Sequence, residues 1–366
     1  MSKELPGSAR ETVSGRNYEH ELWRGSHLAA KLRRQRELGA EPPRVLIADR
    51  DGTHSMDGQV FQGSAEALAV HTADTAKLND YLADRGIILI MNTGGSVEMM
   101  EAGLVDGTIP ADAVLVLGGS EFWVAKDGRY ERDVAYQDYI ENVIGYRREA
   151  LYPLCQDFLR DMTASGGARR VDMWFQPADS ETNIQAWQVY RKDPQGTQLP
   201  AEMEPPAHKI SFDIEGPEAD AEYARFELAK RLDARGLERL TVVHTADNYQ
   251  TDRYSLHLLP LGKREAADIV IELLERQCGP VLAAVAGDAQ NDTEMVLNSG
   301  SVGIAVGNRQ EALERAIEEL PSTRETKHFK IVGDRIIYRD DTERTAAASL
   351  LQAVRALETA DILLRS

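Results

Sequence analysis

Several features are scarce in this 366-residue chain, and each shortage excludes a class of protein. The two cysteines, Cys155 and Cys278, lie far apart with no CxxC or zinc-site spacing, which argues against a disulfide framework or zinc module. Apolar runs such as residues 86–91 have the length of a strand and cannot cross a bilayer. The first residues lack the apolar segment of a secretory signal. We therefore expect a cytoplasmic protein without membrane contact.

Basic residues are outnumbered as well, with 42 Lys and Arg against 60 Asp and Glu and a formal net charge of −18. A nucleic-acid-binding protein normally presents a basic face, so we expect no nucleic-acid partner. An anionic small molecule stays possible as a substrate, because one pocket can be basic on an acidic protein. The hydrophobic content of 42% and the charged content of 28% are typical of a globular enzyme.

Residues 1–43 differ from the rest of the chain. Tyr18 to Leu38 has the pattern of a helix, and Gly39 with Pro42-Pro43 ends it before the first strand. This N-terminal extension is either an arm that packs on the body or on a second subunit, which would give a homodimer, or a solvated and frayed segment.

From residue 44 onward, short apolar runs alternate with amphipathic helices. Strands are predicted at residues 45–48, 87–91, 113–117, 281–286 and 302–306. Helices are predicted at residues 64–85, 97–102, 263–277, 292–299, 312–319 and 346–364. This rhythm predicts an α/β fold with a Rossmann-like, doubly wound parallel sheet, whose site lies at the carboxyl ends of the strands.

The rhythm is interrupted between residues 121 and 259. A long helix is predicted from about residue 136 to 162, followed by strands at residues 171–176, 208–214, 240–244 and 254–259. The alternation in HKISFDI, residues 208–214, is typical of a half-buried antiparallel strand. We therefore predict an inserted α+β lid at 121–259, and a core formed by 44–120 and 260–366.

Acidic and polar residues gather at the ends of the predicted core strands or at the start of a helix. The four segments are Asp49-Arg50-Asp51-Gly52-Thr53, Thr93-Gly94-Gly95-Ser96, Lys263, and Gly287-Asp288-Ala289-Gln290-Asn291-Asp292. In extended chain, residues i and i+2 point to the same side, so Asp49 and Asp51 are expected to face one site. Carboxylates there are costly unless a cation or a reaction holds them. Oxygen ligands, an ammonium and loop amides suit a phosphoryl group bound with Mg²⁺.

Each segment by itself has a plainer interpretation. DxDGT resembles a calcium-binding loop, but His54 and Val60 occupy the positions where an EF-hand needs Gly and Glu. A Gly-rich turn or a lysine in the first turn of a helix is common in any fold. It is the four segments in order, each at a strand end or helix start, that favour a site over a structural turn.

Together these segments resemble motifs I to IV of the haloacid dehalogenase-like (HAD) phosphatases, and residues 121–259 resemble the C2-type cap of that superfamily. GGSEFW, HKISFDI, LLPLGKREA, NDTEMV and GIAVGN resemble its sucrose-phosphate phosphatase-like branch. The resemblance covers roughly residues 44–320 and leaves out the N-terminal extension.

The resemblance implies catalytic roles. Asp49 is the expected nucleophile, which forms an aspartyl-phosphate, and the Asp51 side chain is the expected proton donor to the leaving sugar oxygen and then the base for water. Thr93 and the amide of Gly94 are expected to bind phosphate oxygens. Lys263 is expected to balance the charge of Asp49 and of the phosphate.

The same resemblance implies the metal site. Mg²⁺ is the expected cofactor, with Asp49, the carbonyl of Asp51 and Asp288 as ligands. Asp292 and Asn291 are expected to support them. In the lid, Lys209 is a candidate for contact with substrate, although a solvent-facing strand lysine explains it equally well, and Glu121 is a similar candidate.

Two residues depart from the family pattern. Arg50 stands where an apolar residue is usual, and Gly95 stands where the branch often has arginine. We expect the core chemistry to survive both departures, whereas the substrate preference depends on them.

The sequence thus predicts a Mg²⁺-dependent phosphatase for a sugar phosphate: sucrose 6-phosphate or a similar disaccharide, glycoside or pseudo-sugar phosphate. Two alternatives stay open. One is a sugar phosphomutase of the same superfamily, and the other is a non-catalytic module that binds a sugar phosphate.

Overall fold

The computed structural model describes residues 23, 25–37, 42–55, 65–95, 97–163, 172–176, 208–246, 253–333, 335–340 and 346–359. The chain forms two compact units. Unit 1 contains residues 1–139 and 263–366, and unit 2 contains residues 140–262. Among the described residues, no helix is long and apolar enough to span a membrane.

A ten-stranded sheet forms the centre of unit 1, in the order β12-β13-β14-β11-β10-β1-β2-β3-β4-β5. The six strands from β14 to β3 run parallel, and two strands at each edge are antiparallel. The strands are β1 (Arg44–Ala48), β2 (Ile88–Asn92), β3 (Ala113–Val116), β4 (Glu121–Lys126), β5 (Arg129–Arg132), β10 (Leu282–Gly287), β11 (Val302–Ala305), β12 (Arg324–Glu325), β13 (Phe329–Val332) and β14 (Arg335–Arg339). This confirms the predicted α/β fold with a mostly parallel sheet.

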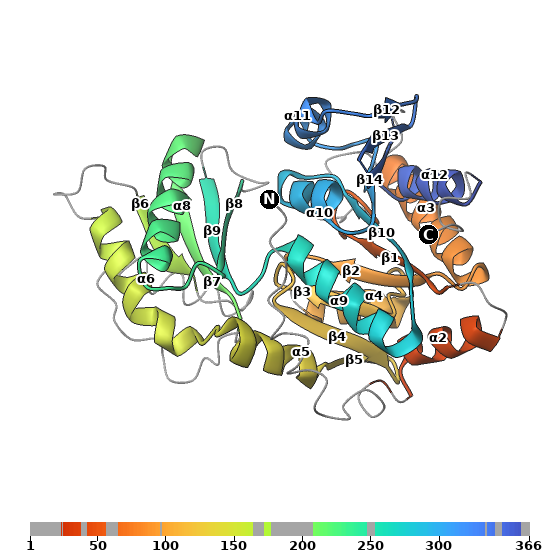
Figure 1. Cartoon of the computed structure of the whole chain (residues 1–366), viewed down its shortest axis with the longest axis horizontal. Helices are drawn as coiled ribbons and strands as arrows, with labels where there is room; N and C mark the ends of the chain where they lie inside the picture. The colour runs from red at the N-terminus through yellow and green to blue at the C-terminus, as the bar shows by residue number, and fades with distance from the viewer. Residues whose placement is uncertain are drawn as a thin grey trace. The chain divides into compact units, whose positions relative to one another are not determined.

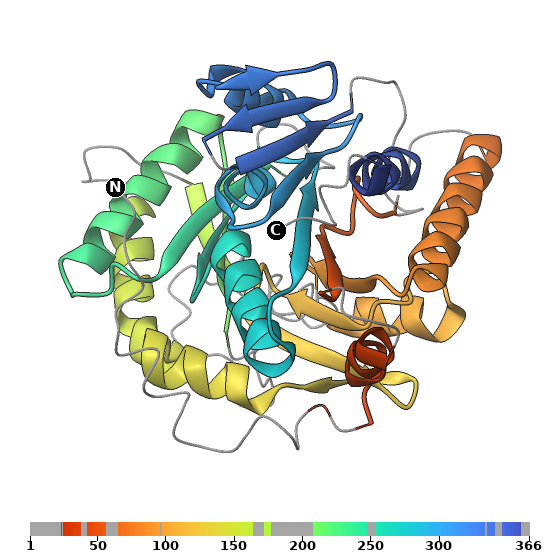
Figure 2. The same ribbon diagram turned by 45° about the vertical axis from the view of Figure 1, so that its right-hand side comes forward.

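Helices cover both faces of this sheet (Figure 1). They are α2 (His27–Glu37), α3 (Ala65–Asp84), α4 (Val97–Asp106), α5 (Val134–Tyr139), α9 (Lys263–Cys278), α10 (Thr293–Asn298), α11 (Glu311–Glu319) and α12 (Ala346–Thr359). Figure 2 shows α3 and α12 side by side on one face and α9 on the other. Alternate strand residues such as Leu46 and Leu89 pack under the first face with Leu78 and Leu350. The layers explain why the central strands read as continuous apolar runs.

The N-terminal extension packs on unit 1 through α2. Leu28 and Leu32 are buried, Lys31 pairs with Asp112 at 2.7 Å, and the Trp23 indole N–H donates to the Asp133 carboxylate at 2.7 Å. Helix α2 begins at His27, and Gly25 takes a φ of +84° in the turn before it, so the predicted helix is not continuous up to residue 38. Its predicted start at Tyr18 lies outside the described residues. Proposed contact with a second subunit through this extension stays a prediction.

The edge strands β4 and β5 belong to unit 1, although the lid was predicted to start at residue 121. The two strands form a hairpin whose turn, Asp127-Gly128, has φ values of +51° and +80°. Positive φ at both central residues matches the right-handed twist of a two-residue hairpin. Because β4 also pairs with β3, residues 121–139 join the core, and the division falls at 139/140 and 262/263.

Unit 2 is an α+β unit with the sheet order β6-β7-β9-β8. Its elements are a π-helical turn (Ile140–Ile144), α6 (Arg148–Thr163), β6 (Asp172–Gln176), β7 (Ile210–Glu215), α8 (Glu218–Asp233), β8 (Thr241–Ala246) and β9 (Arg253–Leu259). The single long helix predicted near residues 136–162 is wrong. Gly145, with a φ of +80°, separates the π-helical turn from α6; a left-handed conformation of this kind ends a helix.

The sheet of unit 2 has one apolar and one polar face. Phe212 packs against Phe158 of α6 at a ring distance of 5.4 Å. The alternate residues of β7 and β9 therefore point the other way. There the Ser211 hydroxyl lies 2.9 Å from Nδ1 of His257, and Asp213 accepts hydrogen bonds from neighbouring β9 side chains. A row of hydrogen-bonding groups thus follows the face away from the helices.

Candidate active site

Three neighbouring parallel strands, β10, β1 and β2, bring the predicted segments together at one edge of the sheet. Ala48 is paired with Ala286 on one side and with Met91 on the other, so the strands end at the same level. Asp49 follows β1 directly, and its backbone N–H donates to the carbonyl of Ala286. Asp288 follows β10 and Thr93 follows β2. The register therefore places these residues at the carboxyl edge, as expected for this fold.

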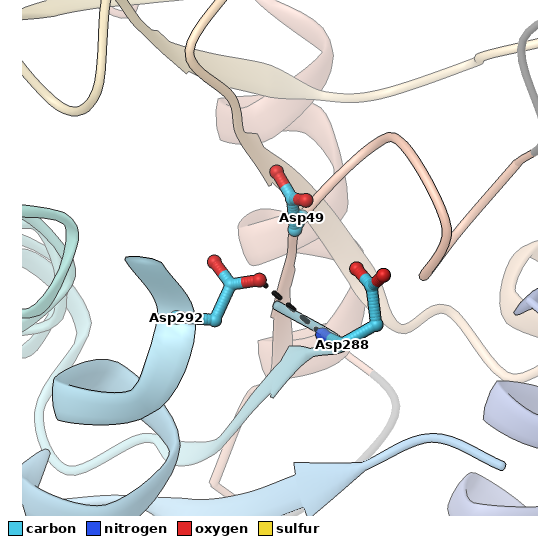
Figure 3. A group of neighbouring side chains, drawn as sticks. All are labelled: Asp49, Asp288 and Asp292. Carbon is cyan, nitrogen blue, oxygen red and sulfur yellow. Dashed lines mark hydrogen bonds between the residues drawn. The ribbon is translucent and has the colours of Figure 1, made fainter. Parts of the chain in front are cut away.

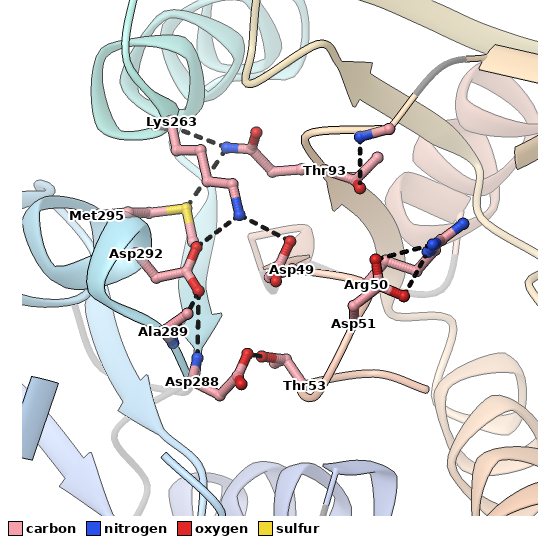
Figure 4. Close-up of polar contacts among 12 residues, drawn as sticks. Asp49, Arg50, Asp51, Thr53, Thr93, Lys263, Asp288, Ala289, Asp292 and Met295 are labelled. Carbon is pink, nitrogen blue, oxygen red and sulfur yellow. Dashed lines mark hydrogen bonds and ion pairs between the residues drawn. The ribbon is translucent and has the colours of Figure 1, made fainter. Parts of the chain in front are cut away.

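An ammonium group lies between two buried carboxylates at the centre of the site. Nζ of Lys263, from the first residue of α9, donates to Oδ1 of Asp49 and to Oδ1 of Asp292, each at 2.7 Å (Figure 4). The side chain of Lys263 is 5% exposed and that of Asp292 is fully buried. Such charge-assisted bonds fix the Asp49 carboxylate in one orientation.

A second set of contacts orients the segment after β10. Oδ2 of Asp292 accepts the backbone N–H groups of Asp288 and Ala289, each at 3.2 Å. The Thr53 hydroxyl donates to Oδ1 of Asp288 at 2.8 Å. Asp292 thus bridges Lys263 and the turn that carries Asp288, and motif I is tied to motif IV.

The carboxylates of Asp49, Asp288 and Asp292 converge (Figure 3). One oxygen from each lies within 4.8 Å of the others, and this is the group of potential metal ligands found among the described residues. Burial raises the pKa of Asp49 well above its usual range, and Asp292 and Asp288 add to the effect while Lys263 opposes it. Burial, with Asp292 next in size, raises the pKa of Asp288 to about 7.

These shifts describe an excess of negative charge. Burial alone would lower the pKa of Lys263, but Asp292 and Asp49 outweigh burial and raise it, so the lysine stays charged. One ammonium faces three carboxylates, and a divalent cation would compensate the remaining charge. Clustered carboxylate oxygens are the donors that Mg²⁺ prefers. The residues present therefore fit a hard divalent metal ion.

Asp51 does not join this group, contrary to the expectation that Asp49 and Asp51 face one site through their side chains. The extended strand ends before Asp51, because the backbone turns at residues 50–55 with Gly52 at a φ of +76°. Nε and a terminal nitrogen of Arg50 donate to the two Asp51 oxygens at 2.9 and 2.8 Å. Figure 4 shows the Asp51 carboxylate facing this guanidinium.

The candidate phosphate-binding turn follows β2. Thr93 is buried and its hydroxyl accepts the N–H of Gly95 at 3.1 Å, while its backbone N–H donates to the carbonyl of Leu115. Gly94 is exposed, and an added Cβ there would meet no described atom within 4 Å. The turn is thus built from Thr93, with Gly94 leaving its backbone accessible, as a phosphate site needs.

Two further residues, Asn92 and Asn308, position the site and were not predicted. The amide of Asn92, the last residue of β2, donates to the backbone carbonyl of Lys263 at 2.9 Å. Asn308 donates to the carbonyl of Gly52 at 2.7 Å and accepts the N–H of Ala346. Asn92 carried a signal in the sequence, since a buried amide at a strand end needs a polar partner, but only the fold shows which partner it has.

The two candidate substrate residues lie in different units. Lys209 precedes β7 in unit 2, where burial lowers its pKa to about 8 against the opposing charge of Asp213. The residue is half-buried. Glu121 begins β4 in unit 1 and is buried; its carboxylate accepts the Trp123 indole N–H at 3.0 Å and pairs with Arg132. Contact with substrate stays a prediction for both residues.

Comparison with known proteins agrees with this arrangement. Residues 161–331 match the family model for sucrose-6F-phosphate phosphohydrolase. The matched region includes Lys263, Asp288 and Asp292, and it excludes the segments of Asp49 and Thr93. No curated protein sequence matched the chain.

Several solved structures are similar to this chain at low sequence identity. SMU.1108c from Streptococcus mutans is 11% identical, with 87% of this chain and 99% of that chain covered at a TM-score of 0.52. The haloacid dehalogenase-like hydrolase yhjK from Bacillus subtilis is 14% identical, with 87% and 94% covered at a TM-score of 0.49. BT1666 from Bacteroides thetaiotaomicron, a phosphatase of the HAD superfamily, is 16% identical, with 87% and 97% covered at a TM-score of 0.45.

The parallel sheet, the lysine between two carboxylates and the three converging aspartates form one candidate catalytic site at the carboxyl edge of the strands. The family match covers residues 161–331, and the fold extends beyond that region.

Proposed function

We propose that this protein is a Mg²⁺-dependent phosphatase that hydrolyses a sugar phosphate through an aspartyl-phosphate on Asp49. The observation that carries the proposal is the placement of Lys263, which holds Asp49 at 2.7 Å within a group of three carboxylates. A buried carboxylate fixed in this way has one oxygen occupied and one left for attack on phosphorus. The attack forms the bond from Asp49 to phosphorus and breaks the bond to the sugar oxygen.

The remaining residues have distinct tasks in this proposal. Lys263 keeps its proton and offsets the charge that gathers on Asp49 and the phosphate oxygens. Thr93 and the backbone of Gly94 bind the phosphate and align it for attack. Asp51 supplies the proton that the leaving sugar oxygen needs and then accepts one from the water that cleaves the aspartyl-phosphate.

Asp49, Asp288 and the backbone of Asp51 would hold Mg²⁺, with Asp292 orienting the turn of Asp288. When bound, the metal ion would supply positive charge beside the transferring phosphoryl group. The shared burial of three carboxylates favours this assignment over a purely structural cluster, since without a cation their mutual repulsion is costly.

A sugar phosphate is favoured by the family match across most of unit 2. The polar face of its sheet offers hydroxyl, imidazole and carboxylate groups in a row, at Ser211, His257 and Asp213. With Lys209 beside Asp213, donors and acceptors alternate as the hydroxyls of a sugar require. We assign recognition of the sugar to this face.

Replacement of Asp49 by Asn tests the reaction. Phosphate release from a panel of sugar phosphates should fall below detection in Asp49→Asn, while Asp74→Asn, an exchange on α3 away from the site, should keep the activity. Mass spectrometry of acid-quenched wild type should find the phosphoryl group on Asp49. Full turnover by Asp49→Asn would refute the proposal.

The same panel separates the alternatives. A phosphomutase would convert a sugar phosphate into its isomer with little free phosphate, and a binding module would do neither. If 4-nitrophenyl phosphate is cleaved with a higher kcat/KM than every sugar phosphate, the sugar assignment fails while the phosphatase assignment stands.

A further inference from the structure

The residue between the two aspartates of motif I forms an ion pair of defined geometry. Arg50 donates from Nε at 2.9 Å and from a terminal nitrogen at 2.8 Å, so both oxygens of Asp51 are occupied. The Arg50 side chain is 9% exposed and that of Asp51 is 44% exposed. Two parallel contacts of this kind fix the direction of a carboxylate as well as its position.

The pair turns Asp51 away from the carboxylates of the site. Asp49 faces Lys263, whereas Asp51 faces the guanidinium on the other side of the turn (Figure 4). Arg50 and Asp51 line a cavity of about 390 Å³ that extends along α3 to Asn79 and Thr108. The Asp51 carboxylate thus lies at the wall of this cavity.

Backbone contacts show that the turn itself is firmly held. The N–H of Ser55 donates to the carbonyl of Arg50 at 2.9 Å, and the N–H of Gly52 donates to the carbonyl of Ser55 at 3.0 Å. Asn308 fixes the Gly52 carbonyl as well. Because the backbone is fixed, Asp51 can reach a different partner only by rotation of its side chain, and that rotation must break both contacts with Arg50.

We propose that Arg50 is a positioning residue that holds Asp51 out of the reaction until substrate binds. This inference rests on the proposed function, in which Asp51 gives a proton to the leaving oxygen. A carboxylate held through both oxygens points at the guanidinium, so Asp51 has to leave this pair before it can reach that atom. The free energy needed to open the pair then adds to the activation barrier of substrates whose leaving group needs a proton. It adds less for substrates whose leaving group departs as an anion.

Arg50→Met, which keeps the volume and removes the charge, tests this by the ratio of kcat/KM for phenyl phosphate to that for 4-nitrophenyl phosphate. We expect the ratio to rise about two- to fivefold, the range that a partly exposed ion pair supports. Arg50→Lys should fall between wild type and Arg50→Met, since lysine cannot make the bidentate contact. In an Asp51→Asn background the Arg50→Met effect on the ratio should vanish, because the two residues act through one contact.

Other outcomes overturn the inference. A lower ratio in Arg50→Met would mean that Arg50 places Asp51 productively, and an equal change in both kcat/KM values would mean a structural role. A wild type that releases phosphate from no sugar phosphate and from neither ester would refute the proposed function and this inference with it. If the wild type is active and Arg50→Met leaves the ratio unchanged, the inference alone is refuted. Crystals with Mg²⁺ and BeF₃⁻ provide a second readout: Asp51 should be out of hydrogen-bonding distance of Arg50, and an intact pair would contradict the proposal.

Discussion

The hydroxyl of Thr53 donates a hydrogen bond to Oδ1 of Asp288 over 2.8 Å, and this contact joins residues 235 positions apart in the sequence. Thr53 is fully buried, and Asp288 has lost most of its contact with water. The bond lowers the pKa of Asp288 against the larger effect of burial, which raises it. Thr53 therefore favours the ionised form of a candidate metal ligand.

Thr53→Val should weaken Mg²⁺ binding, because the variant has nearly the same volume but cannot donate to Asp288. Groups that orient a metal ligand typically change metal affinity about ten- to hundredfold, and we expect a loss in that range by isothermal titration calorimetry. Thr53→Ser keeps the hydroxyl and serves as the control. Equal affinities in Thr53→Val and wild type would show that the hydrogen bond does not act on the metal site.

Lys263→Met should destabilise the metal-free protein by about 3–5 kcal/mol, which is the cost of removing one partner of a buried ion pair. The ammonium lies between Asp49 and Asp292, which would then face each other without a cation. Lys230→Met is the control: that lysine is 66% exposed and pairs with Glu227 on the surface of α8, so its replacement should cost under about 1 kcal/mol. Urea denaturation measures both.

Saturating Mg²⁺ should restore part of the stability lost in Lys263→Met, since a divalent ion replaces the missing positive charge. The same addition should have no larger effect on Lys230→Met than on wild type. A Lys263→Met variant as stable as wild type without metal would show that the three carboxylates tolerate one another unaided, and the argument for a metal ion would lose its basis.

The pKa of Asp288 predicts how stability depends on pH in the absence of metal. Its folded-state value of about 7 exceeds the ordinary value of 3.8. Between these two pH values the folded protein binds a proton that the unfolded chain releases. The contribution of Asp288 to the free energy of unfolding is therefore fully present below about pH 4 and is lost as pH rises through about 7. Relative to Asp288→Asn, the free energy of unfolding of wild type should fall over this interval by an amount on the order of a few kcal/mol.

Chemical denaturation of wild type and Asp288→Asn at several pH values measures this difference. The comparison with the variant removes the contribution of other carboxylates, many of which sit in ion pairs and change stability in the opposite direction. With Mg²⁺ present, the wild type should no longer lose stability as pH rises. A difference that stays constant from pH 4 to 8 would show that Asp288 is ionised throughout.

Elements of the fold that depend on the order of apolar and polar residues along the chain could be predicted from the sequence. The apolar runs before Asp49, Thr93 and Asp288 predicted three parallel strands, and their register brings these residues to one edge. The hairpin of β4 and β5 was missed although Asp127-Gly128 is a strong turn signal. The helix break at Gly145 was missed because one glycine inside a helical pattern is usually tolerated.

The prediction that the side chains of Asp49 and Asp51 face one site failed for a physical reason, whereas the catalytic role of Asp51 stays a prediction. Alternation places residues i and i+2 on one side only while the chain is extended, and here the strand stops at Ala48. Beyond the turn, the Asp51 carboxylate points toward the nearest cation, which is the guanidinium of its neighbour Arg50. Contacts such as Asn308 with Gly52 depend on the tertiary arrangement and leave no local pattern to read.

Gly52→Ala should damage the site beyond the strain of its backbone, and Gly107→Ala provides a matched control. Both glycines have a φ of +76°. An added Cβ at Gly52 would lie 2.3 Å from Oδ2 of Asp288, whereas at Gly107 it would meet no described atom within 4 Å. Alanine at positive φ lowers the free energy of unfolding by about 1 kcal/mol at either position. We therefore expect Gly107→Ala to lose this much stability and to keep its Mg²⁺ affinity. In Gly52→Ala the carboxylate of Asp288 must shift from its position, and Mg²⁺ affinity should fall at least about tenfold, as for other changes that misplace a metal ligand. Calorimetric titration with Mg²⁺ together with urea denaturation separates the loss of metal affinity from the loss of stability.

Equal losses of stability with intact metal binding in both variants would show that Asp288 adjusts freely and that the close approach of Gly52 does not shape the site.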